Sequence, residues 1–154
     1  MTDDPVPATL LSGTALTVFR LNGQFLDVAD KLARPAGLTA AWWQVLGAVL
    51  EKPLPVAGIA RVMGITRQSV QRIADLLVEH GLAEYRPNPA HVRAKLLEPT
   101  EVGRAAVHRI IPAHRRLAEL LAAELGLEGF EHALETLTKL SEAMTAIEGR
   151  GFSG

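Results

Sequence analysis

The sequence predicts a mainly α-helical chain with one small β-hairpin, a fold of the α+β class. Over most of the 154 residues, apolar side chains recur at the three-, four- and seven-residue spacings of amphipathic helices. Strand-like alternation occurs only between residues 82 and 97. Glycine or proline stands at each boundary between these segments. A chain of this length can bury a core without covalent links, and the absence of cysteine excludes disulfides and thiolate metal sites.

The first two helices are separated by a short break. Residues 1–8 are expected to be disordered, and residues 10 to about 32 have the spacing of an amphipathic helix. Pro35 and Gly37 end that helix. Thr39 is a suitable N-cap for a second helix with a broad apolar face.

A short third helix is predicted after the prolines that follow. It spans about residues 56–63, with Ile59, Ala60 and Val62 directed inward and Gly64 closing it.

Thr66 can cap a fourth helix that runs to about His80, with Gly81 in the position of a C′ glycine. Its apolar residues form one stripe: Val70, Ile73, Ala74 and Leu77. The outward face of its first two turns is polar: Arg67, Gln68, Ser69, Gln71 and Arg72.

The alternating segment is read as a β-hairpin. Its second strand is expected over residues 92–97, and Pro87 and Pro89 are placed in the tip because proline cannot donate to a central strand.

Two further helices complete the chain. One runs from Thr100 to about Leu125 with a kink predicted at Pro112, and the last spans about residues 128–148. The last helix carries a heptad-like apolar seam: Phe130, Leu134, Leu137, Met144 and Ile147. Such a seam is suited to packing on another helix, either of a second subunit or within the monomer.

The net charge of −1 conceals an uneven distribution along the chain. Residues 61–116 hold ten Lys and Arg against five acids, whereas the remainder holds six against twelve. This asymmetry favours a polyanion as partner for one face, although chance clustering would also produce it.

Other function classes find little support in the sequence. The acidic N-terminal residues and the interrupted apolar runs indicate neither a secretory signal nor a membrane span, so a cytoplasmic location is expected. No phosphate-binding glycine motif or nucleophile elbow is found, so we expect no enzyme activity and no cofactor. His108 and His114 stand six residues apart on one helix, which makes a shared metal ion unfavourable.

A short helix, a tight turn, a helix with a polar face and a basic hairpin together describe a winged helix. The polar helix face carries the donors and acceptors that read base edges in the major groove, and the hairpin can place Arg93 in the minor groove. A polar face alone is more often simply solvated, so the combination with the hairpin is what favours DNA binding.

Residues 38–103 resemble the MarR family of bacterial transcriptional regulators. The stretch ITRQSVQRIADLLVEHGLAEYRPNPAHVRAKLLEPTEVG is similar to the family's recognition helix, wing and following helix, and LTAAWWQVLGAVLEKPLPVAGIARVMG is similar to its second and third helices. Two positions depart from the family pattern. His91 stands in place of the wing Asp that would pair with Arg93, and Pro99 stands in place of the Leu before Thr100.

The resemblance implies a homodimer on a palindromic operator, with residues 37–99 as the DNA-binding lobe and residues 9–36 and 100–150 as the dimerisation region. The expected DNA contacts are Thr66, Arg67, Gln68, Ser69, Gln71, Arg72, Arg86, Asn88, His91, Arg93 and Lys95. The expected dimer contacts are Leu11, Phe130, Leu134, Leu137 and Met144. A repressor relieved by a small apolar or aromatic ligand is also implied, with a pocket near Phe19, Trp42, Trp43 and His108. A winged helix used only for protein contacts and a metal-responsive regulator are the alternatives.

Overall fold

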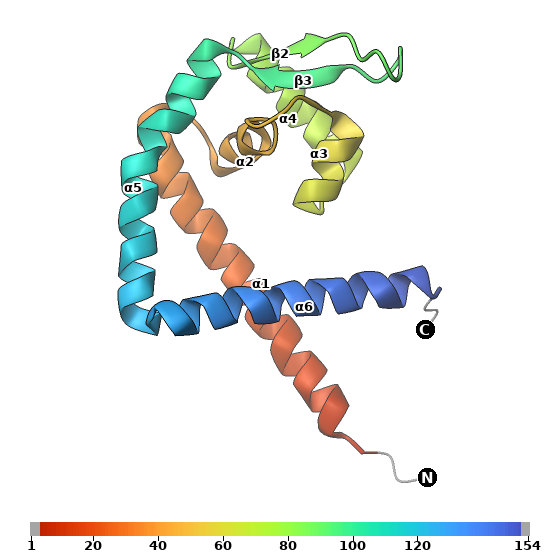
Figure 1. Cartoon of the computed structure of the whole chain (residues 1–154), viewed down its shortest axis with the longest axis vertical. Helices are drawn as coiled ribbons and strands as arrows, with labels where there is room; N and C mark the ends of the chain where they lie inside the picture. Colours follow the sequence, from red (N-terminus) through yellow and green to blue (C-terminus); the bar gives the residue numbers. More distant parts are fainter. Residues whose placement is uncertain (1–3, 152–154) are drawn as a thin grey trace. The chain divides into compact units, whose positions relative to one another are not determined.

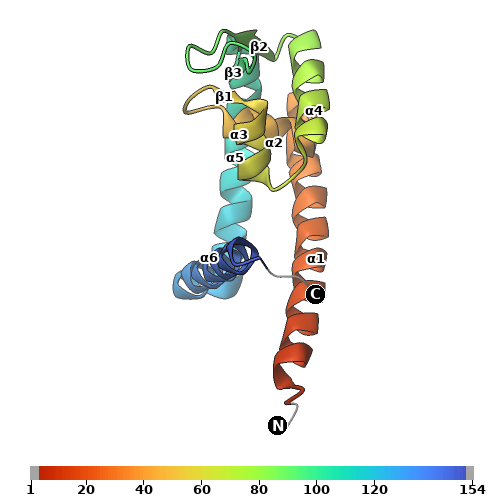
Figure 2. The same cartoon turned by 90° about the vertical axis from the view of Figure 1, so that its right-hand side faces the viewer.

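The computed structural model describes residues 4–151, and it divides the chain into two compact units. The first ends at Ile111, and the second begins at Pro112, inside a long helix. Each unit is described by itself, with Figures 1 and 2 giving the course of the elements.

The first unit begins with helix α1 (Val6–Ala33), which a one-turn 3-10 helix (Arg34–Ala36) and Gly37 bring to an end. Gly37 has a φ of 80°, a conformation that favours glycine. Asp30 connects this end to the next helix, because its carboxylate accepts from the Arg34 Nε at 2.8 Å and from the Ala40 amide at 3.2 Å. The bond from Arg34 and then that from Ala40 lower the pKa of Asp30.

Three short helices follow, and their boundaries agree with the sequence prediction. Helix α2 (Ala40–Ala48) is capped by Thr39, whose hydroxyl accepts from the Trp42 amide at 3.1 Å. Helix α3 (Val56–Met63) ends at Gly64, which has a φ of 68°. Helix α4 (Arg67–Glu79) begins after this turn.

A three-stranded antiparallel sheet has the order β1-β3-β2. Strand β2 (Ala83–Arg86) pairs with β3 (Leu96–Pro99), and the two-residue strand β1 (Leu54–Pro55) pairs with the other edge of β3. Figure 1 shows the loop between β2 and β3 projecting from the helices of this unit. Strand β1 is absent from the sequence prediction because a strand of two residues, one of them a proline, has no detectable alternation.

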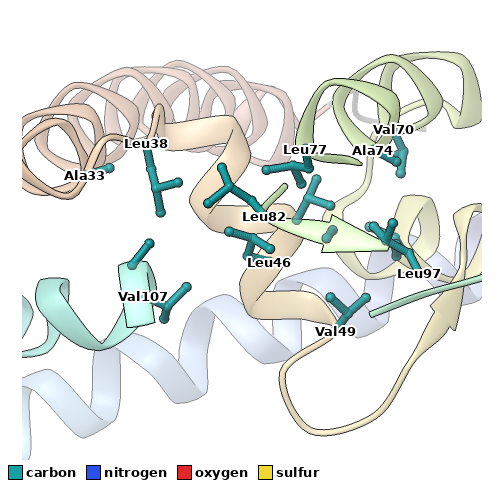
Figure 3. Packing of buried hydrophobic residues seen from close by; sticks show 14 of the residues in the cluster. Ala33, Leu38, Leu46, Val49, Val70, Ala74, Leu77, Leu82, Leu97 and Val107 are labelled. Atoms are coloured by element: carbon teal, nitrogen blue, oxygen red, sulfur yellow. The ribbon is translucent and has the colours of Figure 1, made fainter. Parts of the chain in front are cut away.

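The core of the first unit joins α2, α4, the sheet and the start of α5 (Glu101–Leu125). Figure 3 shows Leu46 of α2, Leu77 of α4, Leu97 of β3 and Val107 of α5 among the side chains packed together. Leu46, Leu77 and Leu97 are fully buried. Each such side chain contributes about 1.5–3 kcal/mol to folding by leaving water.

The start of α5 is bound closely to the residues that follow α4. Thr100 donates its amide to the Leu82 carbonyl at 3.1 Å and its hydroxyl to the Gly81 carbonyl at 2.7 Å. The same hydroxyl accepts from the Gly103 amide at 3.1 Å and so caps α5. A Cβ atom added at Gly103 would overlap with the Leu82 carbonyl oxygen, so the close approach requires glycine there.

The second unit contains the rest of α5, from Pro112 to Leu125, and helix α6 (Leu127–Gly149). Gly126 separates the two helices with a φ of 72°. Helix α6 has no buried residue, so its apolar seam is open in the single chain.

Three expectations about local structure were wrong. Helix α1 begins at Val6, so residues 6–8 are helical rather than disordered, and residues 1–3 lie outside the described residues. Pro7 fits the first turn, where its missing N–H would have no helical partner. Val62 is 68% exposed, because Ile59 and Ala60 occupy the inward face of α3.

The third error concerns the hairpin. Residues 92–95 form no strand, and Val92 is 93% exposed. Pairing begins only at Leu96, opposite Arg86, so both prolines and all the basic residues of the tip lie in a loop of residues 87–95. Within residues 4–151, no helix has both the length and the apolar character needed to cross a membrane.

Replacing Gly103 by Ala should destabilise the protein by about 1–3 kcal/mol, because the new methyl group must displace the backbone at Leu82. Gly47→Ala in α2 is the matched control, since an added Cβ meets nothing there and alanine favours a helix. Chemical denaturation measures the free energy of unfolding of both variants. Equal stability of the two variants would contradict the close packing at Gly103.

Candidate nucleic-acid interface

The first turn of α4 is fixed by Thr66. Its hydroxyl accepts from the Ser69 amide at 3.1 Å and donates to the Ser69 hydroxyl at 2.9 Å. This cap, after the left-handed turn at Gly64, leaves Arg67 and Gln68 exposed at the helix start. The unpaired amides of a helix N-terminus carry a partial positive charge, so this end favours an anion.

The loop of residues 87–95, called the wing below, is held by local backbone bonds. The Asn88 side chain accepts from the Ala90 amide at 3.0 Å, and its carbonyl accepts from the His91 amide at 3.2 Å. The His91 carbonyl accepts from the Ala94 amide at 3.2 Å. His91 and Arg93 are both basic and cannot form the ion pair that an Asp at position 91 would allow, so these turns fix the loop.

A cleft of about 550 Å³ lies between α3, α4 and the wing. Its lining residues are Pro55, Val56, Ala57, Arg67, Gln68, Gln71, Tyr85, Arg93, Ala94 and Lys95. Three of them are cations, from α4 and the wing, and none is acidic. The cleft therefore offers a concentrated positive charge with amide groups beside it, which is called the cationic cleft below.

The other expected DNA contacts lie outside this cleft. Ser69 and Arg72 line a shallow hollow on the outer side of α4. Arg86 and Asn88 line a third hollow at the base of the wing. Arg86 of β2 also forms an ion pair with Glu98 of β3 at 2.8 Å. This pair links the two strands and partly neutralises the charge of Arg86.

Two more cations of the basic segment are engaged in the fold. Arg104 donates to the Leu50 carbonyl at 3.1 Å and Arg109 to the Ala36 carbonyl at 3.3 Å. They attach α5 to the ends of its neighbours. The cations of this segment that line the cleft are Arg67, Arg93 and Lys95, from α4 and the wing.

A side-chain network connects α4 to the sheet. The Gln71 amide nitrogen donates to the Asp75 Oδ1 and to the Tyr85 hydroxyl, each at 2.9 Å, and the Tyr85 hydroxyl donates to the same Asp75 oxygen at 2.5 Å. Burial and the Asp75 carboxylate beside it raise the pKa of Tyr85 to about 12. The hydroxyl therefore keeps its proton near neutral pH.

Sequence reasoning missed Tyr85, Asp75 and the residues of β1 and α3 that line the cleft. Gln71 and Asp75 stand four residues apart, the spacing at which side chains meet on a helix. The contact between these two residues could therefore have been predicted from the sequence. Nothing in the sequence placed Tyr85 beside them, since that contact spans fourteen residues and depends on the turn at Gly81.

Three of the residues expected to line a ligand pocket, Phe19, Trp42 and Trp43, lie in different surroundings. The ring of Trp42 packs on His80 with centroids 4.9 Å apart, Trp43 packs against the core, and Phe19 is 69% exposed. A hollow of about 590 Å³ lies between α1, α2 and α3. Its lining is mainly apolar: Asn22, Leu26, Gln44, Gly47, Ala48, Val62, Met63 and Ile65.

Comparison with known proteins gives one family match and several relatives of similar sequence. A model described as MarR family matches residues 36–94. An uncharacterised protein of Mycobacterium tuberculosis is 43% identical over 106 residues, which cover 66% of this chain and 74% of that protein. The HTH-type transcriptional regulator PetP of Rhodobacter capsulatus is 31% identical over 90 residues, covering 56% of this chain and 54% of PetP.

The fold is also similar to that of solved structures. The transcriptional regulator MosR of M. tuberculosis, in a crystal structure with DNA, has a TM-score of 0.68 and 24% identity, over 84% of this chain and 96% of MosR. At this identity the similarity shows a shared fold.

The raised pKa of Tyr85 can be measured directly, because Tyr85 is the only tyrosine in the chain. Ultraviolet absorbance should show it ionising at about 12 in the folded protein, and Asp75→Asn should move that pKa toward the ordinary value of 10. Because folding raises the pKa of Tyr85, the protein keeps its full stability below pH about 10 and loses part of it as the pH rises toward 12, first because the phenolate would be buried and then because it would lie beside the Asp75 carboxylate. Circular dichroism confirms that the fold persists, and ionisation near 10 in the folded parent would contradict the network.

Proposed function

We propose, because this chain belongs to the MarR family of transcriptional regulators, that it binds duplex DNA through the cationic cleft as a homodimer. The family and the fold are those of transcription regulators rather than enzymes. The observation that carries the proposal is the joining of Arg67, Arg93 and Lys95 in one cleft whose lining includes no acidic residue.

In this proposal the start of α4 enters the major groove and the wing follows the adjacent backbone. Gln68 and Gln71 have amide groups that match base edges, while Arg67 and Lys95 neutralise phosphates. Arg93 is the cation of the wing that enters the minor groove, where the negative potential is strongest. Ser69 and the helix N-terminus hold a further phosphate.

Dimerisation is supported by apolar faces that remain open in the single chain. Leu134 of α6 is 68% exposed, and Leu137 and Met144 are exposed on the same seam. Leu11 of α1 is 67% exposed. A twofold dimer would cover these residues and place two recognition helices on a palindromic operator, about one turn of DNA apart.

A winged helix that contacts only proteins is the rival function. The cationic cleft argues against it, because the centres of protein interfaces are depleted in charged residues. The salt dependence of binding separates the two, since each phosphate neutralised lowers affinity by about 0.9 log units per log unit of salt.

Relief of repression by a small apolar ligand is a further part of the proposal. The apolar hollow between α1, α2 and α3 supports it better than the pocket expected from the sequence. A ligand there would act by favouring a state in which the two recognition helices no longer match both half-sites. An affinity change of about 5- to 150-fold corresponds to a coupling of about 1–3 kcal/mol.

Arg93→Ala should weaken operator binding by about 5- to 150-fold and lower the salt slope by about 0.9, because one cation leaves the cleft. Lys31→Ala is the matched control, since Lys31 forms an exposed pair with Asp27 on α1 and lies outside the cleft lining. Fluorescence anisotropy against duplexes selected from a random pool measures both. Parent-like affinity of Arg93→Ala would remove the wing from the interface.

Leu137→Glu should convert the dimer into monomers, because it places a charge in the apolar seam of α6. Sedimentation velocity measures the change. Glu135→Gln, a conservative change outside the seam, should leave the dimer intact. A Leu137→Glu protein that remains dimeric would place the interface elsewhere.

A further inference from the structure

We propose that Tyr85 is a positioning residue for DNA recognition: it holds the Gln71 side chain in one place at the cationic cleft and so sharpens the choice of the base that Gln71 reads. The inference rests on the proposed DNA-binding function and deepens it, because it adds a residue that acts on specificity through another side chain. It follows from the contacts that join Gln71 of α4 to Tyr85 of β2.

The Gln71 side chain is exposed, but its end is bound. Its amide nitrogen lies 2.9 Å from the Tyr85 hydroxyl oxygen and 2.9 Å from the Asp75 Oδ1. These two oxygens are themselves 2.5 Å apart, so the nitrogen faces them as a pair. The contact with Tyr85 ties the side chain to a strand fourteen residues away in the sequence, whereas Asp75 lies on the same helix.

Tyr85 is a fixed point for this contact. Its backbone pairs with the fully buried Leu97 of β3, and its partly buried side chain packs against the core. Its hydroxyl donates its one hydrogen to the Asp75 Oδ1, and the pKa of about 12 keeps that hydrogen in place at neutral pH. The hydroxyl oxygen is therefore left as an acceptor, which is its role toward the Gln71 nitrogen.

Asp75 determines which way the Gln71 amide is turned. An ionised carboxylate can only accept hydrogen bonds, so it favours the amide nitrogen beside it and repels the amide oxygen. The Tyr85 hydroxyl agrees with this orientation, since its hydrogen is given to Asp75. The Gln71 amide is thus held in one orientation as well as in one place.

Gln68 provides a contrast within the same interface. It is exposed and lines the same two hollows as Gln71, the cationic cleft and the hollow on the outer side of α4. Within residues 4–151 its side chain makes no hydrogen bond. A free side chain of this length loses its rotamer freedom when it binds, whereas a held one has lost it on folding. Of these two glutamines, Gln71 is the one that is ordered in advance.

A held side chain distinguishes bases more strongly for two reasons. Binding to the matching base costs less, because the side chain is already immobilised. Against a mismatched base the side chain cannot turn away, so polar groups stay unpaired in the interface. Both effects widen the ratio of affinities for the two bases, and neither changes the number of phosphates that are neutralised.

The test measures base discrimination at one operator position with the full-length protein. Selection from a random duplex pool, with the parent and with Gln71→Ala, identifies the position that Gln71 reads, because the variant loses its preference there. Fluorescence anisotropy then gives the ratio of affinities for the best and the worst base at that position. In Tyr85→Phe, which removes only the hydroxyl, this ratio should fall by about 2- to 12-fold, the range for immobilising one long side chain anew. The salt slope and the preferences at the other positions should stay as in the parent.

A double variant tests whether Tyr85 acts through Gln71. In the Gln71→Ala protein, adding Tyr85→Phe should change neither affinity nor base preference, since the side chain that Tyr85 holds is gone. A purely structural role of Tyr85 would lower the affinity for all duplexes alike in both backgrounds, and a direct contact of its hydroxyl with DNA would also persist in both.

Asp75→Ala replaces Tyr85→Phe in this test if circular dichroism shows that Tyr85→Phe does not fold. Asp75 is exposed on α4, where alanine favours the helix. Without the carboxylate, the Tyr85 hydroxyl can donate to the Gln71 Oε1 as readily as it accepts from the nitrogen, so both amide orientations are open. The ratio at the Gln71 position should then fall in the same way.

The failures are distinguishable. A parent that binds no duplex, or binds without salt dependence, overturns the proposed function and this inference with it. A parent whose affinity falls steeply with salt, but whose preferences are the same as those of Gln71→Ala at every position, overturns only the inference. An unchanged ratio in Tyr85→Phe overturns it too, as does an equal fall at positions that Gln71 does not read. So does a Tyr85→Phe change that lowers affinity in the Gln71→Ala protein as much as in the parent.

Discussion

The close approach of α5 to the segment that follows α4 is the constraint on which the rest of the first unit depends. Thr100 binds the carbonyls of Gly81 and Leu82, and Gly103 lets the two backbones come together. This junction closes the hairpin at its base. Because β3 enters α5 there, these contacts fix the base of the hairpin relative to the end of α4.

Some cations of residues 61–116 hold the fold together, and others line the cleft. Arg104 and Arg109 bind carbonyls of the core elements, and Arg86 pairs with Glu98 within the sheet. Arg67, Arg93 and Lys95 remain at the cleft. An excess of positive charge along a sequence therefore overstates the charge at the interface, since part of it stabilises the fold that presents the remainder.

The second unit has a different physical basis. Helix α6 buries no residue, so the hydrophobic term that stabilises the first unit is missing from it in the single chain. Helices without a core of their own gain stability by packing on a partner. The proposed dimer would provide that partner, so that its assembly and the stability of this unit would be one process.

The sequence by itself determined the helices, their caps and the polar face of α4. These features depend on residues within one or two turns of each other, as at Thr39, Thr66 and Gly64. The family resemblance is confirmed, with the family model matching residues 36–94, because its motifs are local. The prolines of the wing were also placed correctly in the tip, because proline cannot pair in a central strand.

Tertiary structure alone decided which polar side chains are free and which are held. Strand β1, the late start of β3 and the exposure of Val62 depend on what packs beside them. So does the contact of Tyr85 with Gln71 and Asp75, because it joins a helix to a strand across the turn at Gly81. The residue type determines how many hydrogen bonds a side chain can make. Neighbours that are distant along the chain determine how many of those bonds remain available to a ligand.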